Sequence, residues 1–468
     1  MIKVKLLFLA ALLAVTLVSC DLFPDIISGL LEENSFYALN METQKYYEVK
    51  AEKLYEGNKC VIWAERSAKV SEDLAKKIAH EYDAEIRPRV TKNFSQKNFN
   101  DGKERFNDML DYANWLAGRN DRKLTILLLD IKDGFKNPKT DSYVAGYFYG
   151  GNFNQKGKIG GTEYYSNGRD MIYIDTYPGL KTQPRQTYAT FAHELQHLIN
   201  FVTRFWMLKE NYTLMDTWID EGLSSQAEYL YLEKNPPGKY EWFKEDIEGT
   251  IAKGNNFFVW GNHDDNPSAI LDDYATVYLF FRWLYLQASP ELQSHIFLDI
   301  ETSGSDNYRV VTNVAQQINL AWGDWETLLR TWLAANYYPK NSYGYTGDTE
   351  LQDKITVKPI AEKTISLYPG EGVYSIIDNS FSAETSGNIR YAELAKNNAV
   401  IGTSPPYTGN VLLTFNANTS NTAARETAVL TGVPVPASQT PARTIQTKTL
   451  TGPYVIDARD MLNKNKKR

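Results

Sequence analysis

The spacing of apolar and polar residues in the N-terminal part of the chain predicts alternating strands and helices. Residues 60–64 and 124–131 are apolar runs rich in β-branched residues, which is typical of buried strands. Residues 67–86 and 103–118 have apolar positions at the three-to-four spacing of amphipathic helices. Residues 143–180 alternate short apolar runs with Gly-rich polar stretches, which predicts hairpins.

The pattern changes twice further along the chain. Residues 181–345 contain long helical segments and most of the ten tryptophans. From residue 346 onward there is no tryptophan, and short strand-like pieces alternate with Thr, Ser, Pro and Gly. We therefore expect an α/β (α+β) domain over 36–345, sheet-rich over 36–180 and helical over 181–345. A C-terminal all-β domain is expected over 346–468.

The first 35 residues have a different character. Residues 1–19 have a short basic start followed by an apolar run, which is the pattern of a secretory signal peptide. The run ends in Leu17-Val18-Ser19-Cys20, which resembles the bacterial lipobox, whose cysteine is lipidated. We expect cleavage before Cys20, a lipid-anchored tether over 20–35 and an extracytoplasmic lipoprotein held at a membrane of the cell envelope. The alternative is an ordinary signal peptide with a chance cysteine.

Composition and charge narrow the possible partners. The 468 residues are 43% hydrophobic and 23% charged, which is typical of a globular protein. The formal net charge is −7, and no dense run of Lys and Arg appears before the last five residues, so nucleic acid is not expected as a partner. Cys60 is the second of two cysteines and lies in a predicted strand, which favours a buried structural thiol.

One predicted helix carries the clearest chemical signal. Pro184 suits its first turn, and His193 and His197 lie one turn apart around Glu194 in the pattern HExxH. The two imidazoles fall nearly opposite an apolar stripe of Tyr188, Phe191, Leu195, Leu198, Val202 and Phe205. This is the geometry of two zinc ligands with a neighbouring candidate base; the alternative is a helix with two surface histidines.

A second predicted helix offers the carboxylate that such a site needs. Catalytic zinc commonly takes three protein ligands and leaves a fourth position for water. In the segment 218–229, Glu221, Ser225 and Glu228 share one helical face, and Ile219 and Leu223 lie on the other. We expect Glu221 to complete a site for one zinc ion per chain.

The two segments HELQH and WIDEGLSSQAE resemble the gluzincin metallopeptidases, and residues 140–340 resemble the hyicolysin family of bacterial secreted metallopeptidases. The resemblance implies a zincin-like α/β domain with an HExxH active-site helix beside an edge strand. It implies His193, His197 and Glu221 as zinc ligands and Glu194 as the base that activates a zinc-bound water. The substrates would be proteins or peptides.

Two further roles are left open. Thermolysin-like enzymes carry an acidic residue four positions after the ligand Glu, where this chain has Ser225, so Glu228 or Asp175 would orient a ligand histidine instead. An oxyanion needs a donor beyond the metal, and Tyr274 and His263 are the candidates, with Tyr274 ahead.

The leading hypothesis is therefore a membrane-tethered zinc endopeptidase that cleaves extracytoplasmic proteins. An aminopeptidase of the same class would be expected to carry a Gly-x-Met-Glu-Asn segment, which does not occur before His193. The alternative from another class is a non-catalytic, zinc-containing surface lipoprotein that acts as a binding protein or adhesin. Proteolysis that a chelator abolishes would separate the protease from the non-catalytic lipoprotein.

Overall fold

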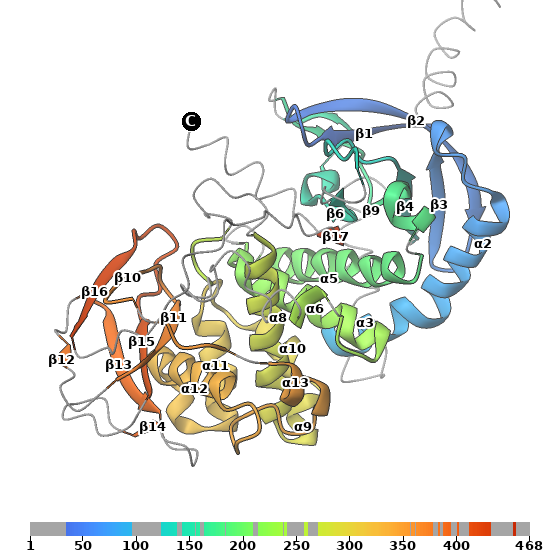
Figure 1. The fold of residues 1–468 in the computed structure, drawn as a ribbon. Helices are drawn as coiled ribbons and strands as arrows, with labels where there is room; N and C mark the ends of the chain where they lie inside the picture. Colours follow the sequence, from blue (N-terminus) through green and yellow to red (C-terminus); the bar gives the residue numbers. More distant parts are fainter. Residues whose placement is uncertain are drawn as a thin grey trace, which may run out of the picture.

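A six-stranded mixed sheet forms the N-terminal half of the computed structural model (Figure 1). The structure describes residues 34–95, 123–137, 143–154, 156–159, 163–182, 184–208, 214–236, 238–240, 257–260, 270–355, 357–360, 362–377, 382–383, 387–394, 400–401, 411–431 and 453–454. The predicted signal peptide, Cys20, His263 and the helix expected over 103–118 therefore lie outside the described residues.

The strand order of this sheet places a short strand at its edge. The order is β1 (Ser35–Asn40), β2 (Lys45–Glu56), β3 (Cys60–Glu65), β4 (Leu124–Leu129), β9 (Met171–Asp175) and β6 (Gly146–Phe148). Strands β3, β4 and β9 run parallel, and β6 pairs antiparallel with β9 at the edge. The predicted strand over 124–131 is thus present but ends at Leu129.

Both faces of the parallel strands are buried, which explains their continuous apolar sequences. Ile126 and Leu128 of β4 face a core shared with the helices, whereas Leu127 and Leu129 face a second core with Trp63. Cys60 lies fully buried in the first core, as expected of a structural thiol, and burial raises the pKa of that thiol.

The helix predicted over 67–86 begins later and ends later than its pattern indicated. Ser71 accepts a hydrogen bond from Leu74 N and caps α2 (Glu72–Glu81), which continues through a π-helical turn (Tyr82–Ile86) into α3 (Arg87–Phe94). The hairpin region contains β5 (Tyr143–Val144) and the antiparallel pair β7 (Gly157–Lys158) and β8 (Tyr165–Ser166). Strand β5 pairs in parallel with β17 (Pro453–Tyr454).

The next part of the chain is helical, as its pattern predicts. Helix α5 (Pro184–Leu208) packs against β6 and β9 on one side and against α6 (Thr217–Leu232) on the other, and α6 packs on α8 (Ile270–Gln287). Shorter helices follow, namely α9 (Pro290–Gln293), α10 (Ile296–Thr302), α11 (Arg309–Ile318), α12 (Trp325–Tyr337) and α13 (Thr349–Lys354). None of the helices in the described part of the chain is long and apolar enough to span a bilayer.

The C-terminal strands form two small antiparallel sheets (Figure 1). One contains β10 (Thr364–Leu367), β16 (Glu426–Thr431) and β12 (Ser382–Ala383); the other contains β11 (Gly372–Ile376), β15 (Val411–Asn416), β13 (Ile389–Leu394) and β14 (Val400–Ile401). Leu367, Leu412 and Leu430 belong to a core between the sheets.

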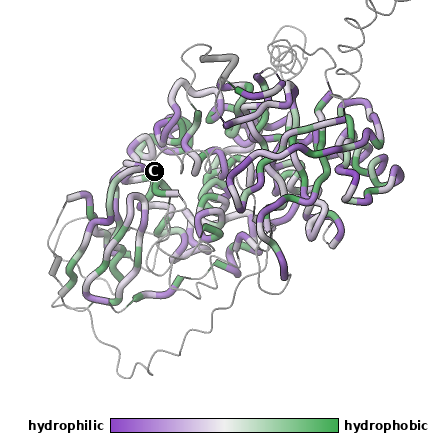
Figure 2. The backbone as a smooth tube through the Cα atoms, turned by 90° about the horizontal axis from the view of Figure 1, so that it is seen from above, coloured by the Kyte–Doolittle hydropathy of each residue, from purple (hydrophilic) through white to green (hydrophobic). Residues whose placement is uncertain are grey.

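The second of these sheets also packs on the helices. Tyr374 of β11 and Phe415 of β15 belong to the large core of the helical part, and the Tyr374 hydroxyl donates to the Leu333 carbonyl at 2.6 Å. In Figure 2, which colours the chain by hydropathy, hydrophobic positions recur in all parts of the described chain, the C-terminal strands included.

Candidate metal centre

Helix α5 presents two histidines to the interior. It begins at Pro184, as the sequence predicts, and His193 and His197 lie one turn apart with their ring centroids separated by 4.7 Å. Both side chains are buried, and so are Phe191, Leu195, Leu198 and Val202 of the apolar stripe on the other side of the helix. The helix is therefore enclosed on all sides from Ala189 to Asn200, which excludes the interpretation of His193 and His197 as surface histidines.

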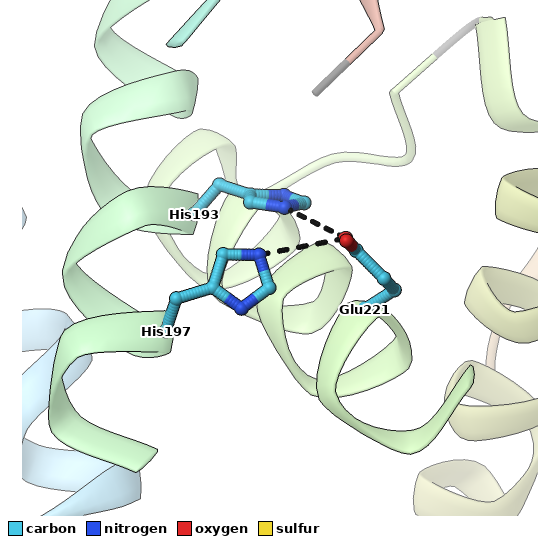
Figure 3. A group of neighbouring side chains, drawn as sticks. All are labelled: His193, His197 and Glu221. Carbon is cyan, nitrogen blue, oxygen red and sulfur yellow. Dashed lines mark hydrogen bonds and ion pairs between the residues drawn. The ribbon is translucent and has the colours of Figure 1, made fainter. Parts of the chain in front are cut away.

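Helix α6 brings Glu221 against both imidazoles (Figure 3). Glu221 Oε2 lies 3.1 Å from His193 Nε2 and 3.5 Å from His197 Nε2. The neighbouring Gly222 allows close packing of α6 on α8, because a Cβ at this position would lie 2.2 Å from Cδ2 of Phe281. The structure thus brings together the three residues that the sequence pattern nominated as ligands.

The donor set of this cluster fits a bound zinc ion. The three ligand atoms all lie within 4.8 Å of one another. In a tetrahedral site with zinc–ligand distances of about 2.0–2.1 Å, neighbouring ligand atoms are about 3.3 Å apart. The distances of 3.1 and 3.5 Å from Glu221 Oε2 to the two histidine Nε2 atoms are close to this value. Glu221 Oε1 is buried and has no hydrogen-bond partner among the described residues, which is costly for a carboxylate unless a cation lies beside it.

Glu194 lies next to a candidate ligand but is not part of the cluster. Its side chain is fully buried, and neither carboxylate oxygen has a hydrogen-bond partner within the described part of the chain. Burial raises the pKa of Glu194 to about 7, although the neighbouring histidines oppose that change. A carboxylate with a pKa near neutrality suits general-base chemistry, because it can both accept and release a proton.

His193 is held from its other ring nitrogen by Glu228. Glu228 Oε1 lies 2.7 Å from His193 Nδ1, and Lys239 Nζ lies 3.4 Å from the same oxygen. Asp175, the other carboxylate considered for this role, lies elsewhere: at the end of β9 it accepts hydrogen bonds from the backbone N–H groups of Ile131 and Gly179. Ser225 contacts Lys239 instead of a histidine, at 3.3 Å.

His197 has two contacts that the sequence pattern did not indicate. Its Nδ1 lies 3.0 Å from Ser224 Oγ and 3.1 Å from Asp220 Oδ2. Asp220 and Ser224 are four residues apart on α6, so they share a helical face. The signal that could have identified them is this spacing of polar residues directly beside Glu221.

Tyr274 lies behind the Glu228–Lys239 pair. It is a buried residue near the start of α8, its ring packs edge-on against Trp260 with the centroids 5.0 Å apart, and Lys239 Nζ lies 4.9 Å from its ring centroid. These contacts place Tyr274 beside the residues that support His193. A role in stabilising an oxyanion is a proposal for Tyr274 first and for His263 second.

The cluster is compatible with the metal centre of a metal-dependent hydrolase, and one comparison with known proteins agrees. The chain is 28% identical over 351 residues to the neutral metalloprotease ShpI of Staphylococcus hyicus, an alignment that covers 73% of this chain and 71% of that protein. No family model matches the chain. The similarity supports a metallopeptidase family and a zincin-like domain for this chain.

Proposed function

We propose that this protein is a zinc endopeptidase of the gluzincin type, similar to the hyicolysins, that hydrolyses peptide bonds in extracytoplasmic proteins. The observation that carries the proposal is the convergence of His193, His197 and Glu221 next to a fully buried Glu194. A structural zinc site would need a fourth protein ligand, and no other His, Cys, Asp or Glu belongs to the cluster in the described part of the chain.

The proposed mechanism divides the chemistry between the metal and the chain. When bound by His193, His197 and Glu221, zinc supplies a Lewis acid that polarises the scissile carbonyl and acidifies water. Glu194 accepts the proton of the attacking water on its carboxylate and then donates it to the leaving amine. Tyr274 or His263 donates a hydrogen bond to the oxyanion that develops on the substrate.

The edge strand supplies a way to hold an extended substrate. Strand β6 ends the six-stranded sheet and packs against α5, and an added Cβ at Gly146 would lie 2.8 Å from Thr190 Cγ2 of that helix. Extended peptides can bind by adding a strand to such an edge. We propose that the substrate pairs with β6, which would place its backbone beside the active-site helix.

The location of the protein is part of the proposal. We propose that residues 1–19 are removed as a signal peptide and that lipidated Cys20 and the tether 20–35 hold the enzyme at a bacterial membrane. The support is the lipobox-like sequence at Ser19-Cys20. Replacement of Cys20 with Ala should release the protein from membranes or leave it unprocessed; normal processing and membrane retention would contradict the anchor.

The decisive experiment replaces Glu194 with Gln, which keeps the size of the side chain and removes its basicity. The variant should fold, hold about one equivalent of zinc and lose hydrolysis of an unfolded protein by roughly 10²–10⁴-fold. Wild-type hydrolysis should stop with a chelator and return with zinc. A wild type that binds zinc but shows no chelator-sensitive hydrolysis would instead favour the non-catalytic binding lipoprotein.

A further inference from the structure

Buried polar residues continue along α5 beyond the two histidines. Gln196, Asn200 and Arg204 follow one another at intervals of four residues, and each is at most 2% exposed. Because buried polar groups need hydrogen-bond partners, a row of this kind in a helix interior indicates a network with a specific purpose. The Glu194 mechanism does not involve any of these three side chains.

The first part of the network connects His197 to α10 in three steps. His197 Nδ1 lies 3.0 Å from Ser224 Oγ, and the Ser224 hydroxyl donates to Gln196 Oε1. The Gln196 amide then donates from Nε2 to Glu301 Oε1 at 2.6 Å. Glu301 is fully buried in α10, so the chain of contacts ends on a carboxyl group with no access to solvent.

The end of α10 is held beside α5 by the last residue of the row. Arg204 donates from Nη1 to the carbonyl oxygens of Ser303 and Ser305, at 3.1 and 2.6 Å. These residues directly follow α10, which ends at Thr302. Arg204 therefore ties the segment that follows Glu301 to α5, the helix that carries Gln196.

The direction of the Gln196 amide contributes to which nitrogen of His197 carries the proton. Because the carboxyl oxygen of Glu301 accepts a hydrogen bond, the NH₂ group of Gln196 points to it and the amide oxygen points to Ser224. Ser224 donates its single proton to Gln196 Oε1 or to the Asp220 carbonyl oxygen at 2.9 Å, and its oxygen accepts from His197 Nδ1–H. Nε2 is left with a lone pair facing Glu221, as a metal ligand requires.

A reversed amide would have the opposite effect. The NH₂ group of Gln196 would donate to Ser224, and the Ser224 hydroxyl proton would then be shared between the Asp220 carbonyl oxygen, at 2.9 Å, and Nδ1 of His197. That arrangement permits the tautomer with the proton on Nε2, which cannot bind a metal through Nε2. The Asp220 carboxylate, whose Oδ2 lies 3.1 Å from Nδ1, also favours a proton on Nδ1, so loss of the relay should weaken the preference for the correct tautomer without abolishing it.

We propose that Glu301 is a positioning residue for the metal centre, acting on His197 through Gln196 and Ser224. The proposal rests on the proposed function, because it takes His197 to be a ligand. Glu301 does not touch the metal or substrate. It acts on the tautomer and orientation of His197 through two intervening side chains.

The test compares two substitutions of Glu301 in the full-length protein. Glu301→Leu removes the acceptor for Gln196, whereas Glu301→Gln retains a carbonyl oxygen that can accept the same hydrogen bond. Zinc affinity is measured by competition with a chromophoric chelator, without any peptide. We expect Glu301→Leu to weaken zinc binding by about tenfold, the lower end of outer-sphere effects, and Glu301→Gln to stay within about threefold of wild type.

A control variant and a double substitution separate positioning from general damage. Asn336→Leu removes another buried hydrogen bond, the one that Asn336 Oδ1 accepts from Tyr345 at 2.6 Å, and should leave zinc affinity unchanged. In a Ser224→Ala background the relay is already broken, so adding Glu301→Leu should reduce affinity by less than about twofold. Thermal unfolding of each metal-free variant checks that it is folded.

Several outcomes would overturn the proposal. They are unchanged zinc affinity in Glu301→Leu, an equal loss in Glu301→Gln, or the full tenfold loss in the Ser224→Ala background. If Glu301→Leu does not fold, Gln196→Met breaks the same relay and is judged by the same criteria. A wild-type protein that binds zinc but hydrolyses no peptide would contradict the proposed function alone. The role of Glu301 is decided by the zinc measurements, which need no peptide.

Discussion

His193 is held between two carboxylates, with Glu228 Oε1 2.7 Å from its Nδ1 and Glu221 Oε2 3.1 Å from its Nε2. Burial would raise the pKa of Glu228, but Lys239 and His193 outweigh that effect and lower it. An ionised Glu228 accepts a hydrogen bond from Nδ1–H of His193, which leaves Nε2 unprotonated for a metal.

Glu228→Gln should therefore weaken zinc binding by about 10–100-fold, because the acceptor that fixes the His193 tautomer loses its charge. Glu221→Gln should weaken binding further, since it removes a candidate ligand. Glu233, at the exposed end of the same helix, provides the control, and Glu233→Gln should bind zinc like wild type. Chelator competition measures all three; a Glu228 variant with wild-type affinity would exclude its supporting role.

Gly222→Ala should destabilise the protein and damage the metal centre together. The new methyl group would lie 2.2 Å from the Phe281 ring, so α6 must move away from α8 and carry Glu221 with it. Overpacking of this kind costs about 1–3 kcal/mol in the free energy of unfolding. Gly238→Ala is the matched control, because nothing lies within 4 Å of a Cβ there. Urea unfolding and zinc titration should show both losses in Gly222→Ala alone.

Asp348→Ala should lower the free energy of unfolding by about 3–5 kcal/mol, because it leaves the buried guanidinium of Arg282 without its carboxylate. Arg282 Nη2 lies 3.1 Å from Asp348 Oδ2, with side-chain exposures of 6% and 7%. The exposed pair of Lys340 and Asp353 serves as the comparison, and Asp353→Ala should cost at most about 1 kcal/mol. Equal losses in the two variants would show that burial of the first pair has no energetic consequence.

Stability should depend on pH through Asp175. Burial raises the pKa of Asp175 to about 7, so the folded protein holds this proton at a pH where the unfolded chain has released it. The contribution is complete below the ordinary Asp pKa of about 3.9 and is lost as pH rises through 7. Asp175→Asn cannot titrate, so the stability of wild type relative to this variant should fall between pH 4 and pH 7. If the free energies of unfolding of wild type and Asp175→Asn change in parallel across this pH range, the raised pKa of Asp175 is contradicted.

Local patterns were sufficient to predict much of the fold and the cluster. The apolar runs at 60–64 and 124–131 became central strands because parallel strands buried on both faces need continuous apolar sequence. Helix α5 was predictable from Pro184 and its periodic apolar stripe. The i, i+4 histidines needed no tertiary information, because helical geometry alone places them on one face.

Other features depend on contacts between segments far apart in sequence. The helix over 67–86 extends to Phe94 because Val90 and Phe94 pack into the large core, which a local window does not register. Asp220 and Ser224 reach His197 only because α6 lies against α5, and Glu301 joins them from α10, 105 residues after Gln196. No spacing rule relates residues on three separate helices.

The sequence by itself determined which elements form and which side chains can serve as metal ligands, since both depend on periodicity and side-chain chemistry within one segment. Only the tertiary structure decided that Glu228, and not Asp175, supports His193, and that Glu301 lies at the end of the His197 network. The physical reason is that hydrogen bonds act over about 3 Å, so the partner of a buried group is set by how helices pack and not by its position along the chain.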